Sequence, residues 1–218
     1  MVKNKEYDDY YKSCWQSGMY WMIEAQTLKV AADKIFDVWH DACQRFKDLK
    51  EEDGHLVTDI YYLTINAEMQ LFPVYMLLMG YAFENLVKGI IICEMRRKDP
   101  DSIDKTNLGD LRLPWKDGIG SCEIGIHGFK KLFKTIYWNI NFLDKEIILL
   151  EETEKCVIWG GKYPVPKFNG SSIDEVMIMG GIVDTGNERS QKHINVLYDK
   201  LLTKLIEELH PKTKELAL

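Results

Sequence analysis

Apolar residues recur along the first quarter of the chain at alternating steps of four and three positions. The series is Tyr7, Tyr11, Cys14, Gly18, Trp21, Ala25, Leu28, Ala32, Ile35, Trp39, Ala42, Phe46 and Leu49. A narrow stripe of this kind predicts one long helix packed lengthwise on its neighbours, with Trp21 and Trp39 in the core. If unbroken, the helix would be roughly 64 Å long at 1.5 Å per residue. A two-chain coiled coil gives the same pattern, but the apolar material elsewhere favours an intramolecular bundle.

A second and more apolar segment follows the turn signal Asp53-Gly54. Thr58 can cap a helix that continues to about residue 97. Because Pro73 lies inside this stretch, either the helix kinks there or two helices abut. From 74 to 93 almost every position is apolar, which is typical of a central helix surrounded on all sides.

The remaining sequence predicts shorter helices separated by turns. Residues 98–126 are rich in Asp, Gly and Pro and predict a long loop excursion. Helical spacing returns at 129–137 and at 144–159, and Thr185 with Glu188 has the spacing of a capping box for a last helix that ends near His210. No segment shows convincing period-two alternation. The expected fold is all-α, an up-and-down helical bundle of four to five main helices with a long first helix, in a single domain spanning 1–218.

Composition and charge narrow the class of protein. The chain has 218 residues, 46% of them hydrophobic and 28% charged, which indicates a globular protein. The net charge of −6 disfavours a protein whose main task is to grip nucleic-acid phosphates. The five cysteines form no C-x-x-C pair and no signal peptide is visible, so we expect free thiols in a reducing cytoplasm. The longest uncharged apolar run, LFPVYMLLMGYAF, is short for a bilayer span, and we expect no membrane partner.

Recognisable metal and cofactor motifs are absent from the sequence. It holds no P-loop, no Rossmann glycine fingerprint, no H-E-x-x-H and no zinc-type cysteine spacing. Two Glu-x-x-His pairs occur, Glu52/His55 and Glu207/His210, and helical bundles can build di-iron sites from such pairs. The first spans the Asp-Gly turn and the second lies where the last helix meets Pro211, so neither is expected to face a bundle core. We therefore expect no metal and no cofactor.

The polar trio Glu84, Asn85 and Lys88 interrupts the most apolar segment. Left unpaired in a core these side chains would be costly, so they must pair, reach solvent or line a cleft. One interpretation is an internal ion pair that fixes helix register. The other is a ligand-binding cleft bordered by His127 and by residues 160–163, where Lys88 and Lys162 supply positive charge and Tyr163 a stacking surface.

A second candidate site lies on the last helix. Arg189 and His193 share a helix face, and an Arg/His pair can steady a phosphodiester and move a proton during RNA cleavage. The alternative is a solvated helix face. The six cations Arg96, Arg97, Lys98, Lys130, Lys131 and Lys134 are expected to be surface charge.

Three short stretches resemble a known family. GYAFENLVKGIII (80–92) resembles the second helix of HEPN-domain proteins, small helical bundles of bacterial toxin, defence and RNA-processing systems. GIHGFKKL (125–132) is similar to the Gly-His-x-x-x-x-Leu start of a later helix in such proteins. WGGKYPVP (159–166) is similar to a Trp-Gly-Arg-Tyr-Pro segment, with Lys162 in place of the arginine.

The resemblance implies a helical fold, frequent homodimers, and either metal-independent ribonuclease activity or non-catalytic binding of RNA, nucleotides or proteins. Catalytic members carry Arg-x4-6-His near the last long helix. Here only three residues separate Arg189 from His193, so the expected function is non-catalytic binding of RNA, a nucleotide or a protein in a bacterial defence or toxin–antitoxin type system. Two alternatives stay open: a ribonuclease that uses Arg189 and His193, and a helical protein-interaction scaffold without a small ligand.

Overall fold

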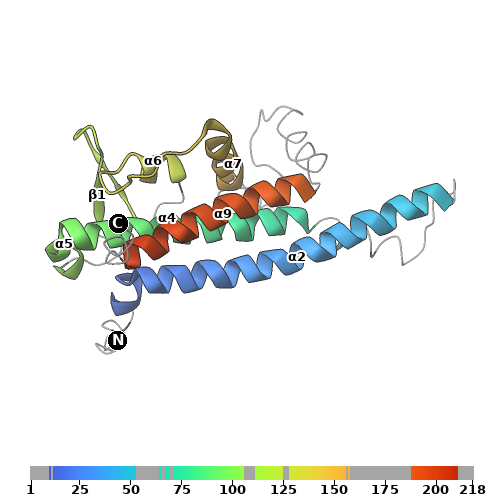
Figure 1. Cartoon of the computed structure of the whole chain (residues 1–218), viewed down its shortest axis with the longest axis horizontal. Helices are drawn as coiled ribbons and strands as arrows, with labels where there is room; N and C mark the ends of the chain where they lie inside the picture. The colour runs from blue at the N-terminus through green and yellow to red at the C-terminus, as the bar shows by residue number, and fades with distance from the viewer. Residues whose placement is uncertain are drawn as a thin grey trace, which may run out of the picture.

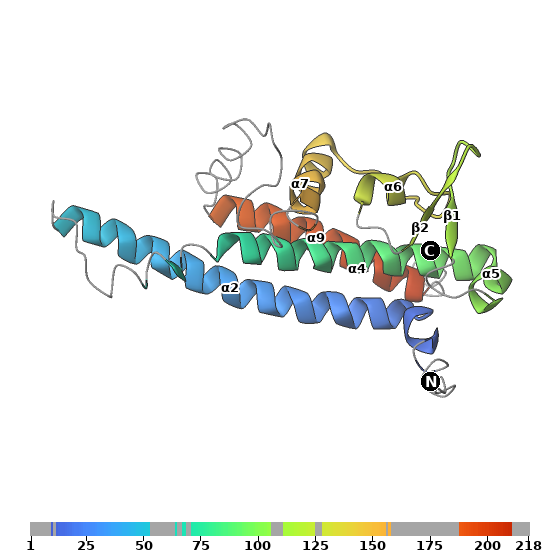
Figure 2. The same ribbon diagram turned by 180° about the vertical axis from the view of Figure 1, so that it is seen from behind.

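The computed structural model describes residues 10, 12–52, 64, 67–68, 71–105, 111–124, 128–155, 157 and 188–210. In these residues the fold is all-α, as predicted, with six helices and one small hairpin. The three longest helices, α2 (Gly18–Glu52), α4 (Phe72–Lys98) and α9 (Glu188–Leu209), lie side by side and nearly parallel in their axes (Figures 1 and 2). The short elements α6 (Phe129–Phe133), α7 (Asp144–Lys155) and the hairpin stand on one side of this group.

Helix α4 is the centre of the bundle, because α2, α5 (Pro100–Lys105), α6, α7 and α9 all contact it. Its buried residues occupy almost every face, including Phe83, Leu86, Ile90 and Ile91 at 0% exposure. The helix begins at Phe72 with Pro73 in its first turn, where the missing N–H has no helical partner in any case. Pro73 therefore starts a helix instead of kinking one.

The long first helix is shorter at its N-terminal end than the sequence predicts. α2 begins at Gly18 after a turn at Gln16–Ser17, closed by a hydrogen bond from the Ser17 amide to the Cys14 carbonyl. The turn directs Trp15 into the core at 2% exposure. Trp39 is buried as predicted, but Trp21 is only partly buried. The indole N–H of Trp21 donates to the Trp15 carbonyl, 2.7 Å away.

The buried face of α2 follows the predicted stripe and includes one residue beside it. Ala25, Ala32, Trp39 and Ala42 are buried at the predicted spacing. Phe36, which was not in the predicted stripe, is buried as well. A straight helix has 3.6 residues per turn, so a strict seven-residue pattern slips by about 20° per heptad and a neighbouring position can share the buried face.

A close crossing of α2, α4 and α9 depends on two glycines. A Cβ on Gly18 would lie 2.3 Å from Cys93 Sγ on α4, and a Cβ on Gly89 would lie 2.9 Å from Leu205 on α9. Neither position accepts a larger side chain without movement of a neighbour. The helix axes approach at this point because both residues lack a side chain.

Residues 98–126, predicted to form a long loop, contain a small hairpin that the sequence pattern did not predict. Strands β1 (Arg112–Pro114) and β2 (Ser121–Glu123) pair antiparallel, with Leu113 opposite Cys122 and Arg112 opposite Glu123. Leu113 and Cys122 are buried whereas Arg112 and Glu123 form an exposed ion pair. Three-residue strands are too short for their alternation to stand out from chance in the sequence.

The segment after α6 is tied to the end of α4 by a buried carboxylate. The predicted helix at 129–137 ends at Phe133, and Tyr137 lies in a turn. Glu94 is fully buried, accepts a hydrogen bond from the side-chain amide of Asn139 and pairs with Arg97. This tether links the chain between α6 and α7 to the end of α4.

Candidate functional site

Glu84 and Lys88 form a buried ion pair on α4. The ammonium nitrogen of Lys88 lies 2.5 Å from Glu84 Oε1, and each side chain is 6% exposed. The same nitrogen lies 5.9 Å from the centre of the Trp21 ring on α2, within range of a cation–π interaction. The pair is therefore enclosed, with an aromatic ring beside the cation, and does not lie on an open solvent face.

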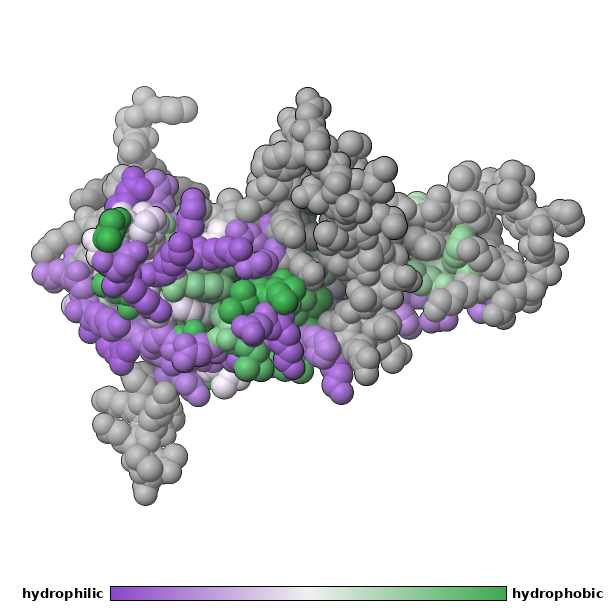
Figure 3. All heavy atoms as spheres, turned by 90° about the horizontal axis from the view of Figure 1, so that it is seen from above, coloured by the Kyte–Doolittle hydropathy of each residue, from purple (hydrophilic) through white to green (hydrophobic). Residues whose placement is uncertain are grey.

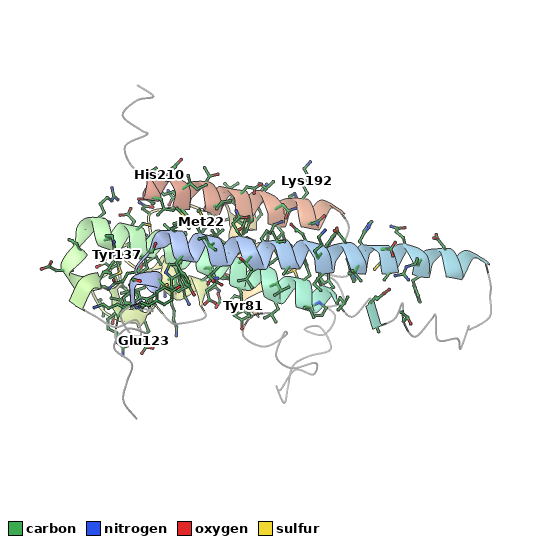
Figure 4. All side chains as sticks on the ribbon, turned by 90° about the horizontal axis from the view of Figure 1, so that it is seen from below. Met22, Tyr81, Glu123, Tyr137, Lys192 and His210 are labelled. Carbon is green, nitrogen blue, oxygen red and sulfur yellow. The ribbon has the colours of Figure 1, made fainter. Side chains whose placement is uncertain are left out.

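Of the other residues predicted to lie around this pair, the structure describes only Asn85. Asn85 is half-buried on the adjoining face of α4. Tyr81, one turn before Asn85, lies on the edge of α4 that is remote from α9 (Figure 4). His127, Lys162 and Tyr163 lie outside the described residues, so the predicted cleft around Glu84 and Lys88 stays a prediction.

An apolar groove lies between α7 and α9. It has a volume of about 380 Å³. Its apolar lining comes from Leu143, Ile148 and Leu149 at α7 and from Val196 and Leu197 on α9; Lys145, Glu146 and His193 complete it. The view from above shows apolar side chains gathered on this face, with hydrophilic residues next to them (Figure 3).

A compact polar junction holds the two walls of the groove together. Glu146 Oε2 accepts a hydrogen bond from the Leu143 amide at 2.8 Å and one from Lys200 Nζ on α9 at 2.6 Å. Lys200 also lies over the Phe142 ring, 5.1 Å from its centre. Burial raises the pKa of Glu146, but the bonds from Lys200 and Leu143 outweigh burial and hold this pKa below its usual value. The carboxylate thus caps the start of α7 and links it to α9.

A second groove continues along α9 from the first. It has a volume of about 430 Å³ and shares Val196 with the first groove. Its remaining lining residues are mostly polar: Ile140, Asp199, Lys200, Thr203, Lys204 and Glu207. Together the two grooves follow the outer face of α9 from His193 to Glu207.

His193 lines the apolar groove between α7 and α9. Its side chain is exposed and lines the apolar section beside Lys145. The side chain of Arg189 lies outside the description, although its backbone is in the first turn of α9. The neighbouring Lys192 projects away from the molecule (Figure 4). The predicted pairing of Arg189 with His193 therefore remains a hypothesis.

The groove residues Leu143, Ile148 and Val196 were not singled out from the sequence. The core face of α9 consists of Ile194, Leu197, Leu201 and Leu205, at helical spacing. Val196 lies off that stripe and is 57% exposed. Leu143 and Ile148, at α7, are also exposed apolar residues. Apolar residues at positions that do not face the core, in both segments, are the sequence signal that could have revealed this surface.

Other candidate chemistry in the described residues is limited. The six cations predicted to be surface charge are all exposed: Arg96, Arg97, Lys98, Lys130, Lys131 and Lys134. No group of three or more His, Cys, Asp or Glu that could hold a metal ion occurs within the ranges described. Cys14, Cys43, Cys93 and Cys122 are free thiols.

By length and composition alone, one described helix could cross a membrane. This helix is α4, and 72% of its most apolar window is buried inside the molecule. The core helix of a soluble protein passes the same test, so the property is weak support for a membrane span.

Comparison of the chain with protein-family models, with curated proteins and with solved structures gives no match.

Proposed function

We propose that this chain is a non-catalytic binding protein that holds a helix of a partner protein in the groove between α7 and α9. The observation that carries the proposal is the exposure of three apolar side chains at one place: Leu143 at 59%, Ile148 at 56% and Val196 at 57%. Apolar side chains gathered on an exposed surface and rimmed by polar groups are typical of an interaction site. A groove between two helices fits an amphipathic helix, whose apolar face it can cover.

The resemblance to HEPN-domain proteins supports the same class of function. It implies binding of RNA, nucleotides or proteins in bacterial defence or toxin–antitoxin type systems, and our proposal selects the protein partner. The net charge of −6 favours that choice over a polyanion. The buried pair Glu84–Lys88 takes a structural role in this proposal, because each charge already has its partner.

Two variants in the groove and two matched controls test the proposal. Val196→Asp and Ile148→Asp place a charge in the groove, whereas Val30→Asp and Ile23→Asp place one at similarly exposed positions on α2, 60% and 54% exposed. The tagged full-length chain is exposed to an extract of its source cells. We expect the wild type and both α2 variants to retain the same discrete protein, and both groove variants to lose it. Equal recovery by all five chains would reject the groove as the binding surface.

The same variants distinguish other occupants of the groove. A second copy of this chain would appear as a dimer in size-exclusion chromatography that Val196→Asp converts to monomer. Nucleic acid would appear as a raised 260/280 nm absorbance ratio of the purified chain, unaffected by the groove substitutions. Either result without a retained protein would contradict the proposal.

Ribonuclease activity is the rival function, and His193 is the residue to test. The HEPN-like pattern needs at least four residues between Arg and His, and one residue of offset turns a helical side chain by about 100°. The purified chain is incubated with mixed RNA in EDTA, beside His193→Ala. We expect no cleavage that depends on His193. A robust activity that His193→Ala abolishes would replace the binding proposal with the ribonuclease.

A further inference from the structure

The turn of the β1–β2 hairpin carries the most exposed large apolar side chain of the described residues. This residue is Ile119, which is 83% exposed. Ile136, 40% exposed, lies beside the same hairpin, because its amide donates to the Pro114 carbonyl of β1 at 2.9 Å. The hairpin rises away from the three long helices (Figures 1 and 2). The apolar tip is therefore convex, unlike the groove between α7 and α9.

Backbone hydrogen bonds hold this turn in one conformation. The Trp115 amide donates to the Gly120 carbonyl at 2.9 Å, and the Gly118 amide donates to the Trp115 carbonyl at 3.1 Å. The Ile119 amide donates to Asp117 Oδ1 at 2.9 Å. Gly118 has a φ of 73°, a conformation that glycine adopts without strain. Ile119 is thus held in its projecting position, and a binding partner loses little affinity to ordering of the turn.

Two exposed lysines stand next to each other beside the tip. The Lys116 amide donates to the Lys134 carbonyl at 2.8 Å, so the two residues lie opposite each other on neighbouring strand segments. The Lys134 ammonium lies 5.8 Å from the centre of the Trp115 ring. Neither lysine forms an ion pair with another described residue. Like charges opposite each other are unfavourable, and a bound anion would relieve this repulsion.

Positive charge exceeds negative charge around the hairpin, although the whole chain has a net charge of −6. Within the described ranges 111–124 and 128–136, the cations are Arg112, Lys116, Lys130, Lys131 and Lys134, and the carboxylates are Asp117 and Glu123. Arg112 pairs with Glu123, and Lys130 pairs with Glu151 on α7. The charges left for an incoming molecule are therefore mainly those of Lys116, Lys131 and Lys134.

From the fixed apolar tip and the unpaired lysines we infer that the hairpin turn binds the surface of an anionic membrane. Ile119 enters the layer between the lipid headgroups, and the ammonium groups of Lys116 and Lys134 lie at the lipid phosphates. A fluid lipid surface accepts a convex apolar tip without a preformed pocket. The contact is peripheral and needs no membrane-spanning segment. It goes beyond the proposed function, because it uses a surface separate from the groove between α7 and α9.

Sedimentation of the full-length chain with lipid vesicles tests the inference. One set of vesicles is phosphatidylcholine alone, and in the other a part of it is replaced by anionic phosphatidylglycerol. We expect the chain to sediment with the anionic vesicles only, and less of it as the salt concentration rises, because salt screens the lysines. The contact should be weak and reversible, since it comprises one inserted side chain and a few charges.

Two variants at the tip and two matched controls show which residues make the contact. Lys116→Ala should weaken binding to anionic vesicles about fivefold, the usual effect of one lysine near such a surface. Ile119→Ser should weaken it by at least about fivefold, because the inserted apolar surface is lost. The controls are Ile23→Ser on α2, at a position 54% exposed, and Lys192→Ala on α9, and both should bind as the wild type does. Circular dichroism checks that each variant is folded.

A photoactivatable diazirine on the anionic lipid locates the contact. We expect mass spectrometry to find the lipid attached to residues 116–120. No binding to anionic vesicles, equal binding by the tip variants and the controls, or lipid attached elsewhere would each overturn the inference. A protein from the cell extract that Ile119→Ser fails to retain, without vesicle binding by the wild type, would assign the tip to a protein partner and also reject it. Val196→Asp should bind vesicles as the wild type does, so failure of the groove proposal is distinguishable.

Discussion

The ammonium group of Lys88 lies 2.5 Å from the carboxylate of Glu84, one turn earlier on α4, and both side chains are 6% exposed. A buried pair of this kind is stable only while both partners are present, because desolvation of one uncompensated charge is costly. Each charge of the pair is therefore tolerated in the core only while the other is present.

Replacement of one of the two charged residues should therefore lower the stability of the fold more than replacement of both. We expect Lys88→Met to destabilise the fold by about 3–5 kcal/mol, and the double variant Glu84→Leu/Lys88→Met to lie within about 1 kcal/mol of the wild type or above it. Urea unfolding followed by circular dichroism measures both. A single variant as stable as the double would show that the carboxylate of Glu84 does not depend on Lys88.

The crossing at Gly18 should reject even a methyl group. Gly18→Ala places a Cβ 2.3 Å from Cys93 Sγ and 3.1 Å from Leu209, and overpacking of this kind costs about 1–3 kcal/mol. Cys93→Ala removes the nearer atom, so the double variant should lose less stability than the sum of the two single losses. Strict additivity in thermal or urea unfolding would mean that the helices separate freely at this point.

Two buried tyrosine hydroxyls are expected to be dispensable for folding. Tyr75 and Tyr198 are 0% and 2% exposed, and their hydroxyls have no hydrogen-bond partner in the described structure. A buried donor without a partner carries a desolvation cost, so Tyr75→Phe and Tyr198→Phe should leave stability unchanged or raise it by about 1 kcal/mol. A clear loss in either variant would show that its hydroxyl is in fact satisfied.

The same tyrosines should make the fold sensitive to alkali. Burial, with a further contribution from Asp33, raises the pKa of both hydroxyls above their ordinary value of 10.0. The unfolded chain then releases these protons at lower pH than the folded chain, so the contribution of the two hydroxyls to stability is constant below about pH 10 and falls as pH rises above it. Unfolding titrations from pH 8 to 11.5 should show this fall, and the variant with both tyrosines replaced by Phe should lose less stability over that range.

Cys93 should be the slow thiol of the native protein. Burial, and then the nearby carboxylate of Glu208, raises the pKa of Cys93 to about 11 from 9.0. At pH 8 that pKa leaves about a hundredfold less thiolate than an ordinary cysteine has, and the thiolate is the reactive form. Iodoacetamide labelling followed by mass spectrometry should find Cys93 slow in the native chain and rapid in urea. Under denaturing, non-reducing conditions all five cysteines should react, since we expect none to be oxidised.

The long elements could be predicted from the sequence and the short ones could not. α2 and α9 have apolar residues at helical spacing over twenty or more positions, and α4 is a longer continuous apolar stretch than a strand would need. The hairpin at Leu113 and Cys122 offers only one buried residue per strand, and α6 offers little more. Such elements form because tertiary contacts hold them, and those contacts do not appear in local periodicity.

In the candidate site, too, some residues could be picked out from the sequence and others could not. Glu84 and Lys88 attract attention in a sequence because they interrupt an apolar helix, and the structure places them in direct contact. Val196 and Ile148 look ordinary in their own helices. They line one groove because α7 and α9, which are more than fifty residues apart in sequence, both pack on α4 and are linked by the Glu146–Lys200 ion pair. A local sequence pattern does not reveal contacts between residues so far apart in the chain.

The central place of α4 has a consequence for how the chain is made. α4 packs on α2, which precedes it, but its other long neighbour is α9, ninety residues further along the chain. During synthesis at about 5–20 residues per second, α4 therefore waits several seconds outside the ribosome with one apolar flank uncovered. A nascent chain of this design is a natural client for a chaperone, and slow translation between α4 and α9 would lengthen its exposure to aggregation.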